Sequence, residues 1–164
     1  MIKNTRAVLL TFGFLIVFSF FLIHLVGRYH QMQCREQLKA LGYAIQVYKD
    51  DNGSLPHQLS VLSNELSNPS LLICPGAGRS PGRFANADAW SDYTFIDWSI
   101  YLGTNTVPSD YPIAYDRHIR NHGGGGVNVL TVDGFVQWDS EAKLLKGFAD
   151  EHPNLKLSIP ENEP

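Results

Sequence analysis

The chain begins with a long apolar stretch, which is followed by a stretch that is apolar on one side only. Residues 7–27 read AVLLTFGFLIVFSFFLIHLVG and contain no Asp, Glu, Lys or Arg. As an α-helix they would extend about 31 Å, close to the ~30 Å hydrocarbon core of a bilayer. The pattern therefore predicts a transmembrane helix over 7–27, with residues 1–6 in the cytoplasm.

The apolar positions after residue 33 recur at steps of four and three, which is the spacing of one helix face. These positions are Cys34, Leu38, Leu41, Ile45 and Tyr48. No proline interrupts residues 7–50, so we expect one continuous helix of about 66 Å. Its second half needs a packing partner for the apolar face. Gly42 either weakens this helix or lets another element approach closely.

Turn-forming residues divide the rest of the chain into short segments. Asn52-Gly53, followed by Pro56, predicts the end of the long helix. Residues 57–66 have the spacing of a short helix, and residues 76–89 are rich in Gly, Pro, Ser and Asn and read as a loop.

The second half of the chain has the composition of β-strands. Aromatic and β-branched residues predict strands at 93–96, with 100–102 as an extension, at 112–115, at 127–132 and at 135–138. Asp133-Gly134 lies between the last two and predicts a hairpin turn, because both residues accept positive φ.

A short helix over 140–149, with its N-cap at Asp139 or Ser140, and a polar tail over 151–164 complete the chain. The fold class that follows is α+β: a long N-terminal helix, first transmembrane and then amphipathic, packed on a small antiparallel sheet. The extracytoplasmic domain would occupy residues 28–150.

Charge and length narrow the functional classes. The net charge of −3 over 164 residues offers no basic surface for nucleic acid.

A cleaved signal peptide is the alternative to a membrane anchor, but its apolar region is usually shorter and ends in a small-residue site, which 7–27 lacks. Lys3 and Arg6 before the apolar stretch favour a cytoplasmic N-terminus, although basic residues also follow it.

Cys34 and Cys74 are the only cysteines. Neither has a Cys or His nearby at zinc-site spacing, so we expect one disulfide between them, with two buried free thiols as the alternative. A disulfide would place both cysteines outside the cytoplasm, in agreement with a cytoplasmic N-terminus and a periplasmic C-terminal domain.

Two further motifs were weighed as sites. His118 and His122 are four residues apart and could share a metal ion on a helix, with Asp116 or Asp133 nearby, but the four glycines at 123–126 indicate a loop. Those glycines lack the Gly-Lys-Ser/Thr of a phosphate loop and lead into a strand. No catalytic motif is present, so we expect a non-enzymatic protein without a cofactor.

Three stretches together resemble the type IV pilin-like proteins, and within them the major-pseudopilin-like proteins of type II secretion found in planctomycetes. They are CREQLKALGYAIQVYKDDNG at 34–53, LICP at 72–75 and HGGGGVNVLTVDGFV at 122–136. The resemblance implies a structural component of a secretion or envelope assembly in the cytoplasmic membrane. Its partners would be the lipid bilayer and other pilin-like or secretion-system proteins.

The N-terminus departs from that family. Its members carry a basic leader ending in Gly, and the fifth residue after the cleavage is a glutamate that helps subunits dock. Gly13-Phe14 is the comparable place here, and the fifth residue counted from Phe14 is Phe18. No prepilin cleavage motif is therefore recognisable, and a tethered periplasmic binding module that does not polymerise is the alternative function.

The resemblance also implies candidate calcium ligands, because some major pseudopilins bind calcium in loops beside the sheet. The aspartates in the comparable region are Asp92, Asp97, Asp110 and Asp116. Their spacing alone does not form a calcium-binding loop.

Overall fold

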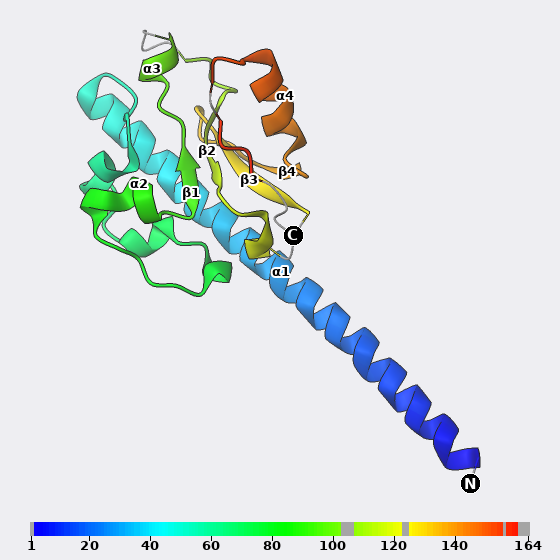
Figure 1. The fold of residues 1–164 in the computed structure, drawn as a ribbon. Coiled ribbons are helices and arrows are strands. Elements are labelled where there is room, and N and C mark those ends of the chain that lie inside the picture. The colour runs from blue at the N-terminus through cyan, green and yellow to red at the C-terminus, as the bar shows by residue number, and fades with distance from the viewer. Residues whose placement is uncertain (1, 103–106, 123–124, 156, 161–164) are drawn as a thin grey trace.

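One helix runs through the membrane-type segment and on into the folded domain. In the computed structural model, which describes residues 2–102, 107–122, 125–155 and 157–160, α1 extends without a break from Ile2 to Asn52. Side chains are described from residue 12 onward, Leu102 excepted. Figure 1 shows the N-terminal part of α1 projecting away from all other elements, while its C-terminal part crosses the domain. The predicted continuous helix is confirmed.

The helix ends where the sequence predicts. Gly53 adopts φ +70°, and its N–H donates to the Lys49 carbonyl oxygen at 2.8 Å. A left-handed residue directly after the last turn is a common helix terminator, and glycine adopts it without a steric penalty.

Short helices and turns connect α1 to the sheet. They are η1 (Leu59–Ser63), η2 (Pro69–Leu72), η3 (Pro75–Ala77), η4 (Phe84–Asn86) and α2 (Ala87–Trp90). The helix predicted over 57–66 is thus one short 3₁₀ segment. Its N–H groups at Leu59 and Ser60 donate to the Asp88 carboxylate, which ties it to α2.

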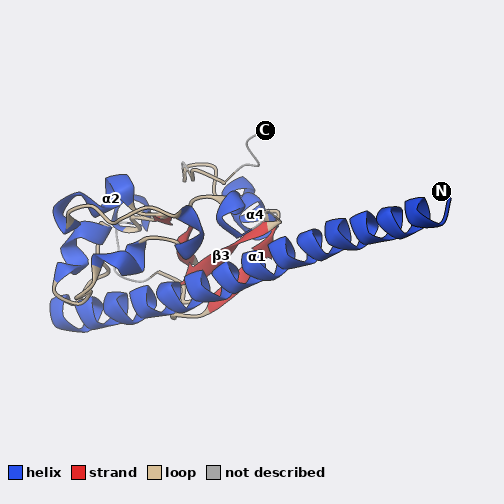
Figure 2. Cartoon of the chain, turned by 90° about the horizontal axis from the view of Figure 1, so that it is seen from below, coloured by secondary structure: helices blue, strands red, loops and turns tan. Residues whose placement is uncertain are grey.

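Four antiparallel strands form the sheet in the order β1-β2-β3-β4. Their bounds are β1 Tyr93–Phe95, β2 Pro112–Asp116, β3 Gly126–Thr131 and β4 Val136–Ser140. Every residue of β2 and β3 is buried, so both faces of the central strands are covered. Figure 2 shows α1 on one side of the sheet and α4 (Lys143–Glu151) on the other.

The predicted helix face is the centre of the core. Leu38, Leu41 and Ile45 are at most 1% exposed, and Tyr48 packs half-buried at the edge of the same cluster. They meet buried side chains of the strands, including Tyr115, Val129 and Leu130. This confirms the packing face that the period of four and three predicts.

The hairpin between β3 and β4 is also confirmed, with one correction to its geometry. Gly134 has φ +86°, whereas Asp133 is not in the left-handed region. The Asp133 carboxylate instead accepts hydrogen bonds from the Thr131 hydroxyl and the Phe135 N–H. The turn therefore needs only one residue of positive φ.

The predicted strand extension at 100–102 is wrong. This stretch belongs to a helical turn, α3 (Ser99–Leu102). The Asp97 carboxylate accepts from the Ser99 N–H at 3.0 Å and from the Ser99 hydroxyl at 2.6 Å, a side-chain cap that favours a helical start over a continued strand.

The last helix begins at Lys143, later than predicted, and its N-cap position is Ala142, so the N-cap predicted at Asp139 or Ser140 is wrong. The Asp139 carboxylate nevertheless reaches the first turn, where its two oxygens accept the N–H groups of Leu144 at 2.9 Å and Leu145 at 3.0 Å. Beyond α4, Leu155 is buried, and the Ser158 carbonyl accepts a hydrogen bond from the Tyr115 hydroxyl. The chain therefore packs on the domain as far as Pro160.

Candidate functional site

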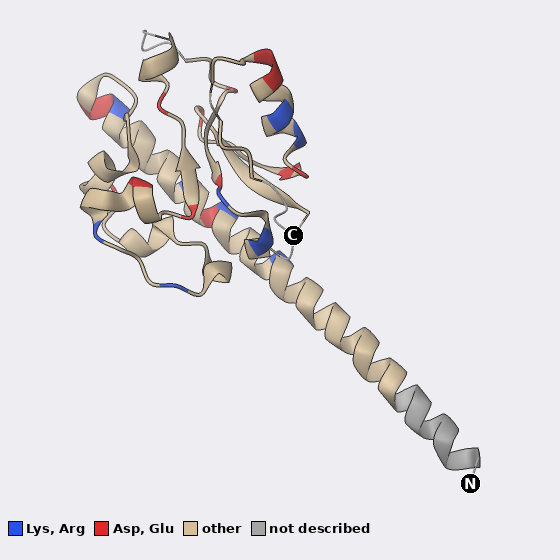
Figure 3. Ribbon diagram, in the orientation of Figure 1, with Lys and Arg blue, Asp and Glu red and all other residues tan. Residues whose placement is uncertain are grey.

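From Phe12 to Val26, α1 carries apolar side chains on all sides, and no other described part of the chain buries them. Every residue from Phe12 to Val26 is exposed, and none is Asp, Glu, Lys or Arg (Figure 3). Phe14, Val17, Phe20 and Ile23 are each more than 60% exposed. Within the described part of the chain, α1 is the one helix whose length and hydropathy would allow it to cross a membrane.

The surroundings of α1 change at Gly27, which is buried where the residues before it are exposed. Arg28 and Tyr29 follow directly, and from there the helix contacts η5 (Ile119–His122), β3 and the turns after η1. Basic and aromatic residues at such a boundary are typical of a helix leaving a bilayer. The site described next lies one to two turns beyond it.

Three side chains that can ligate metals converge in the domain just beyond this boundary. The Cys34 and Cys74 sulfurs and a His122 ring nitrogen all lie within 4.8 Å of one another, and all three residues are buried. His122 Nε2 lies 3.4 Å from the Cys74 sulfur. The residues come from α1, from the turn before η3 and from η5, so the cluster joins three separate segments.

The local structure explains why these segments meet. Cys34 begins the apolar face of α1 that packs into the core. The Cys74 N–H donates to the Asp92 carboxylate at 2.9 Å, which holds the turn against the start of β1. Gly76 lies so close to η5 that a Cβ there would be 2.1 Å from the Asn121 carbonyl oxygen. Only glycine permits that approach, which brings His122 beside Cys74.

A carboxylate faces the other side of the histidine ring. Asp116 Oδ2 lies 3.6 Å from His122 Nδ1, and both side chains are buried. Asn128 orients this carboxylate, donating to Oδ2 from its backbone N–H at 2.6 Å and from its side chain at 2.9 Å. Burial raises the pKa of Asp116 to about 7, against the opposing effects of His122 and the Asn128 hydrogen bonds.

The two thiols titrate differently because of their contact. Contact with the other sulfur lowers the pKa of Cys74, and the same contact together with burial raises the pKa of Cys34. Burial lowers the pKa of His122, but its contacts with Cys74 and Asp116 outweigh burial and the pKa is raised overall. The cluster therefore favours negative charge on Cys74 beside a proton-bearing imidazole.

The disulfide predicted between Cys34 and Cys74 is not formed in this structure. Both residues are free, buried thiols. The prediction that the two residues meet is correct, but a bond would need the sulfurs about 2.05 Å apart with a defined torsion. Here Cys74 is instead placed in contact with the imidazole of His122.

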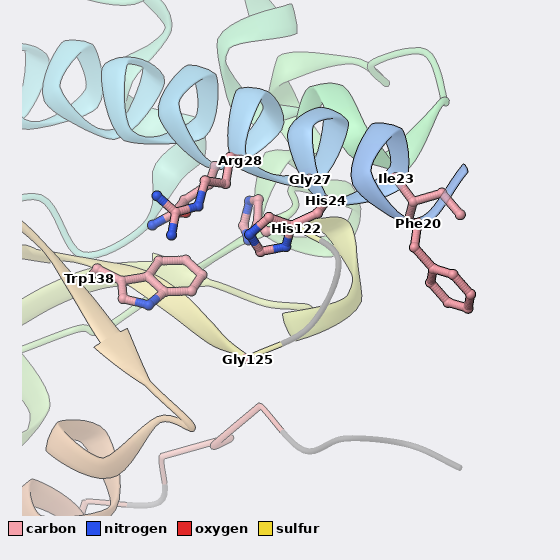
Figure 4. Close-up of a pocket in the computed structure, with 9 residues that line it drawn as sticks. Phe20, Ile23, His24, Gly27, Arg28, His122, Gly125 and Trp138 are labelled. Atoms are coloured by element: carbon pink, nitrogen blue, oxygen red, sulfur yellow. The ribbon is translucent and has the colours of Figure 1, made fainter. Parts of the chain in front are cut away.

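A cavity of about 330 Å³ opens beside the cluster, at the end of the domain nearest the apolar half of α1. His24, Arg28, His122 and Trp138 are among the residues that line it (Figure 4). His122, whose side chain is fully buried, therefore lies between the core and this cavity.

The remaining predicted site residues do not gather. His118 is exposed whereas His122 is buried, so the pair does not share a ligand position. Asp92 pairs with Arg79, Asp97 caps α3, and Asp110 lies near α4. The four predicted calcium ligands thus have separate surroundings: Asp116 faces His122, and Asp92 accepts the Cys74 N–H.

The sequence predicts that Cys34 and Cys74 meet, but it does not predict that His122 joins them. The three are 40 and 48 residues apart along the chain, far from the short ligand spacings of zinc motifs. The helix face accounts for the first pair, because Cys34 lies on the buried stripe and Cys74 follows the apolar residues Leu71, Leu72 and Ile73. The sequence carries no comparable signal for His122.

No protein-family model, curated protein or solved structure matches the chain. The arrangement itself, a long apolar N-terminal helix packed on a four-stranded antiparallel sheet, is a pilin-like architecture.

Proposed function

We propose that the protein is a non-enzymatic, pseudopilin-like structural component of a secretion or envelope assembly, anchored in the cytoplasmic membrane by the N-terminal half of α1. The observation that carries the proposal is that one uninterrupted helix has two different surroundings. Residues 12–26 are exposed and apolar on all sides, whereas the apolar stripe from Cys34 to Ile45 is buried in the core of the domain.

A lipid environment accounts for the bare half of the helix better than water does. Soluble monomers rarely expose a continuous apolar surface of this kind. In a bilayer, a helix satisfies its own backbone hydrogen bonds, and apolar side chains can face lipid in every direction. Neighbouring apolar helices offer the same environment, so the segment suits both anchoring and association.

The domain would lie in the periplasm, with the N-terminus in the cytoplasm. Lys3 and Arg6 precede the apolar segment, and the domain begins directly after it. The rigid connection matters for the role: because α1 does not break at the boundary, a domain would be held in a fixed direction relative to the membrane. A subunit that assembles in register with its neighbours benefits from such a connection.

Cross-linking in the membrane tests this function. A photo-reactive phenylalanine analogue at Phe21, in the bare half, should give products between copies of this chain or with a pilin-like partner. The analogue at Tyr43, which is exposed on the domain half, is the matched position outside the bilayer. The mass of the mature N-terminus, Met1 or Phe14, shows in the same material whether a peptidase has acted.

The alternative is a tethered periplasmic binding module that does not polymerise. It is favoured by Phe18, which stands where pilin-like subunits carry their docking glutamate, and by the cavity at the membrane-facing end of the domain. A chain that stays monomeric, with no cross-links to itself or to pilin-like proteins from Phe21, would contradict the structural role and favour this one.

A further inference from the structure

We propose that Cys34, Cys74 and His122 form a zinc-binding site that fastens α1 to the turn at Cys74 and to η5. Two thiols and an imidazole are the ligand types that zinc selects in proteins. The site is independent of the membrane role: it would exist whether or not the protein assembles.

The geometry of the three ligand atoms fits a tetrahedral ion. Zinc bonded to sulfur at about 2.3 Å and to nitrogen at about 2.0 Å holds the two ligand atoms about 3.5 Å apart. The Cys74 sulfur and His122 Nε2 are 3.4 Å apart. Two sulfurs on such an ion are about 3.8 Å apart, within the 4.8 Å that bounds all the ligand atoms here.

The surroundings of His122 match those of a metal-bound histidine. Ligation through Nε2 requires the ring proton on Nδ1, and a carboxylate or carbonyl commonly accepts it. Asp116 lies on that side at 3.6 Å, itself oriented by two hydrogen bonds from Asn128. His122 Nδ1 is buried without a hydrogen bond of normal length. If Asp116 moved closer when the metal binds, its carboxylate would accept the Nδ1 proton.

The charges of the ligands suit a divalent ion. Binding of Zn²⁺ to the pair releases the thiol protons and leaves two thiolates balanced by the dication, a buried arrangement without net charge.

A zinc ion held by three side chains commonly takes water as its fourth ligand. The cavity that His122 helps to line lies beside the three ligands. A disulfide would not explain why His122 contacts Cys74 or why Asp116 faces the imidazole. A zinc ion bound by Cys74 and His122 explains both contacts.

Metal content and thiol state test the proposal on the full-length protein, extracted in detergent without chelator or reductant. We expect zinc at one ion per chain, lost in Cys34→Ser, Cys74→Ser and His122→Ala. His118→Ala is the matched control, because His118 is exposed four residues away, and it should keep its zinc.

Cobalt substitution tests the ligands without any variant that might fail to fold. Co²⁺ added to the chelated wild-type protein should give a thiolate-to-cobalt charge-transfer band and the visible bands of tetrahedral coordination. A chain two hydrogens lighter that cannot be alkylated and holds no metal would overturn the proposal in favour of a disulfide. Two alkylatable thiols without metal or cobalt bands would overturn it as well.

Discussion

Gly42 of α1 lies directly against Leu130 of β3: a Cβ at Gly42 would be 2.9 Å from Leu130 Cδ1 and 3.5 Å from the Cα of Gly134. Glycine is a weak helix former, so its place in the middle of a long helix is explained by this close approach. Four residues along, the Gln46 side chain donates to the Val132 carbonyl oxygen at 2.6 Å. The β3–β4 hairpin thus rests on α1 through a glycine contact and through side-chain hydrogen bonds, which include one from the Asn128 side chain to the Gln31 carbonyl oxygen at 3.3 Å.

Gly42→Leu should destabilise the domain by about 1–3 kcal/mol, because the new side chain has no room between α1 and the hairpin. Gly42→Ala is the matched control. Alanine has a helix propensity about 1 kcal/mol more favourable than glycine. This gain offsets the close contact of the new methyl group with Leu130, which a rotation of the flexible Leu130 side chain can relieve. Thermal unfolding in detergent measures both. Equal stability of the leucine and alanine variants would contradict the close approach.

Leu41→Ala should cost about 2–5 kcal/mol, since Leu41 is fully buried in the core between α1 and the sheet. Tyr43→Ala, two residues away on the exposed side of the same helix, should change the free energy of unfolding little. Denaturant titration of the two variants compares them. A comparable loss at both positions would mean that the stripe is not the packing face.

Asp139→Ala should destabilise the protein by about 1–2 kcal/mol, because the N–H groups of Leu144 and Leu145 lose their acceptor. Asp139→Asn keeps one acceptor oxygen and should lose less. Ser140→Ala, at an exposed neighbour, is the control. Hydrogen exchange at the amides of Leu144 and Leu145 should accelerate in Asp139→Ala and stay slow in Ser140→Ala.

Val17→Lys should impair membrane integration, since a lysine near the middle of the apolar segment costs about 2.5–3.5 kcal/mol for insertion. The fraction of protein resistant to alkaline extraction measures the effect. Tyr43→Lys places the same charge on the exposed side of the domain half and should leave that fraction unchanged. Full extraction resistance in Val17→Lys would argue that this segment is not in the bilayer.

The elements that depend on local periodicity could be predicted from the sequence. The continuous helix, its end at Gly53, the stripe from Leu38 to Ile45 and the Asp133-Gly134 hairpin each follow from residues close together in the chain. Burial of one face and the preference of glycine for positive φ are strong enough there to decide the structure.

The strand expected at 100–102 is a helical turn because Asp97 caps it from two residues before Ser99, a local contact that the sequence reading missed. Features that depend on contacts between distant segments could not be predicted. His122 joins Cys34 and Cys74 only because Gly76 lets η5 approach the turn at Cys74. Asp116 was considered both as a calcium ligand and beside the histidines, and β2 places it against His122.

The division of α1 between bilayer and water can be measured directly with two variants that each add one cysteine, Val17→Cys and Tyr43→Cys. These positions are 69% and 74% exposed on the same helix, so their difference reports the surroundings alone. The unmodified chain, whose two cysteines are buried, gives the background. A membrane-impermeant maleimide applied to the periplasmic face of intact cytoplasmic membrane should label Tyr43→Cys, and should label Val17→Cys only after the membrane is dissolved. Equal labelling of both variants in intact membrane, or labelling of Tyr43→Cys from the cytoplasmic face alone, would contradict a helix that spans the bilayer and carries its domain outside the cytoplasm.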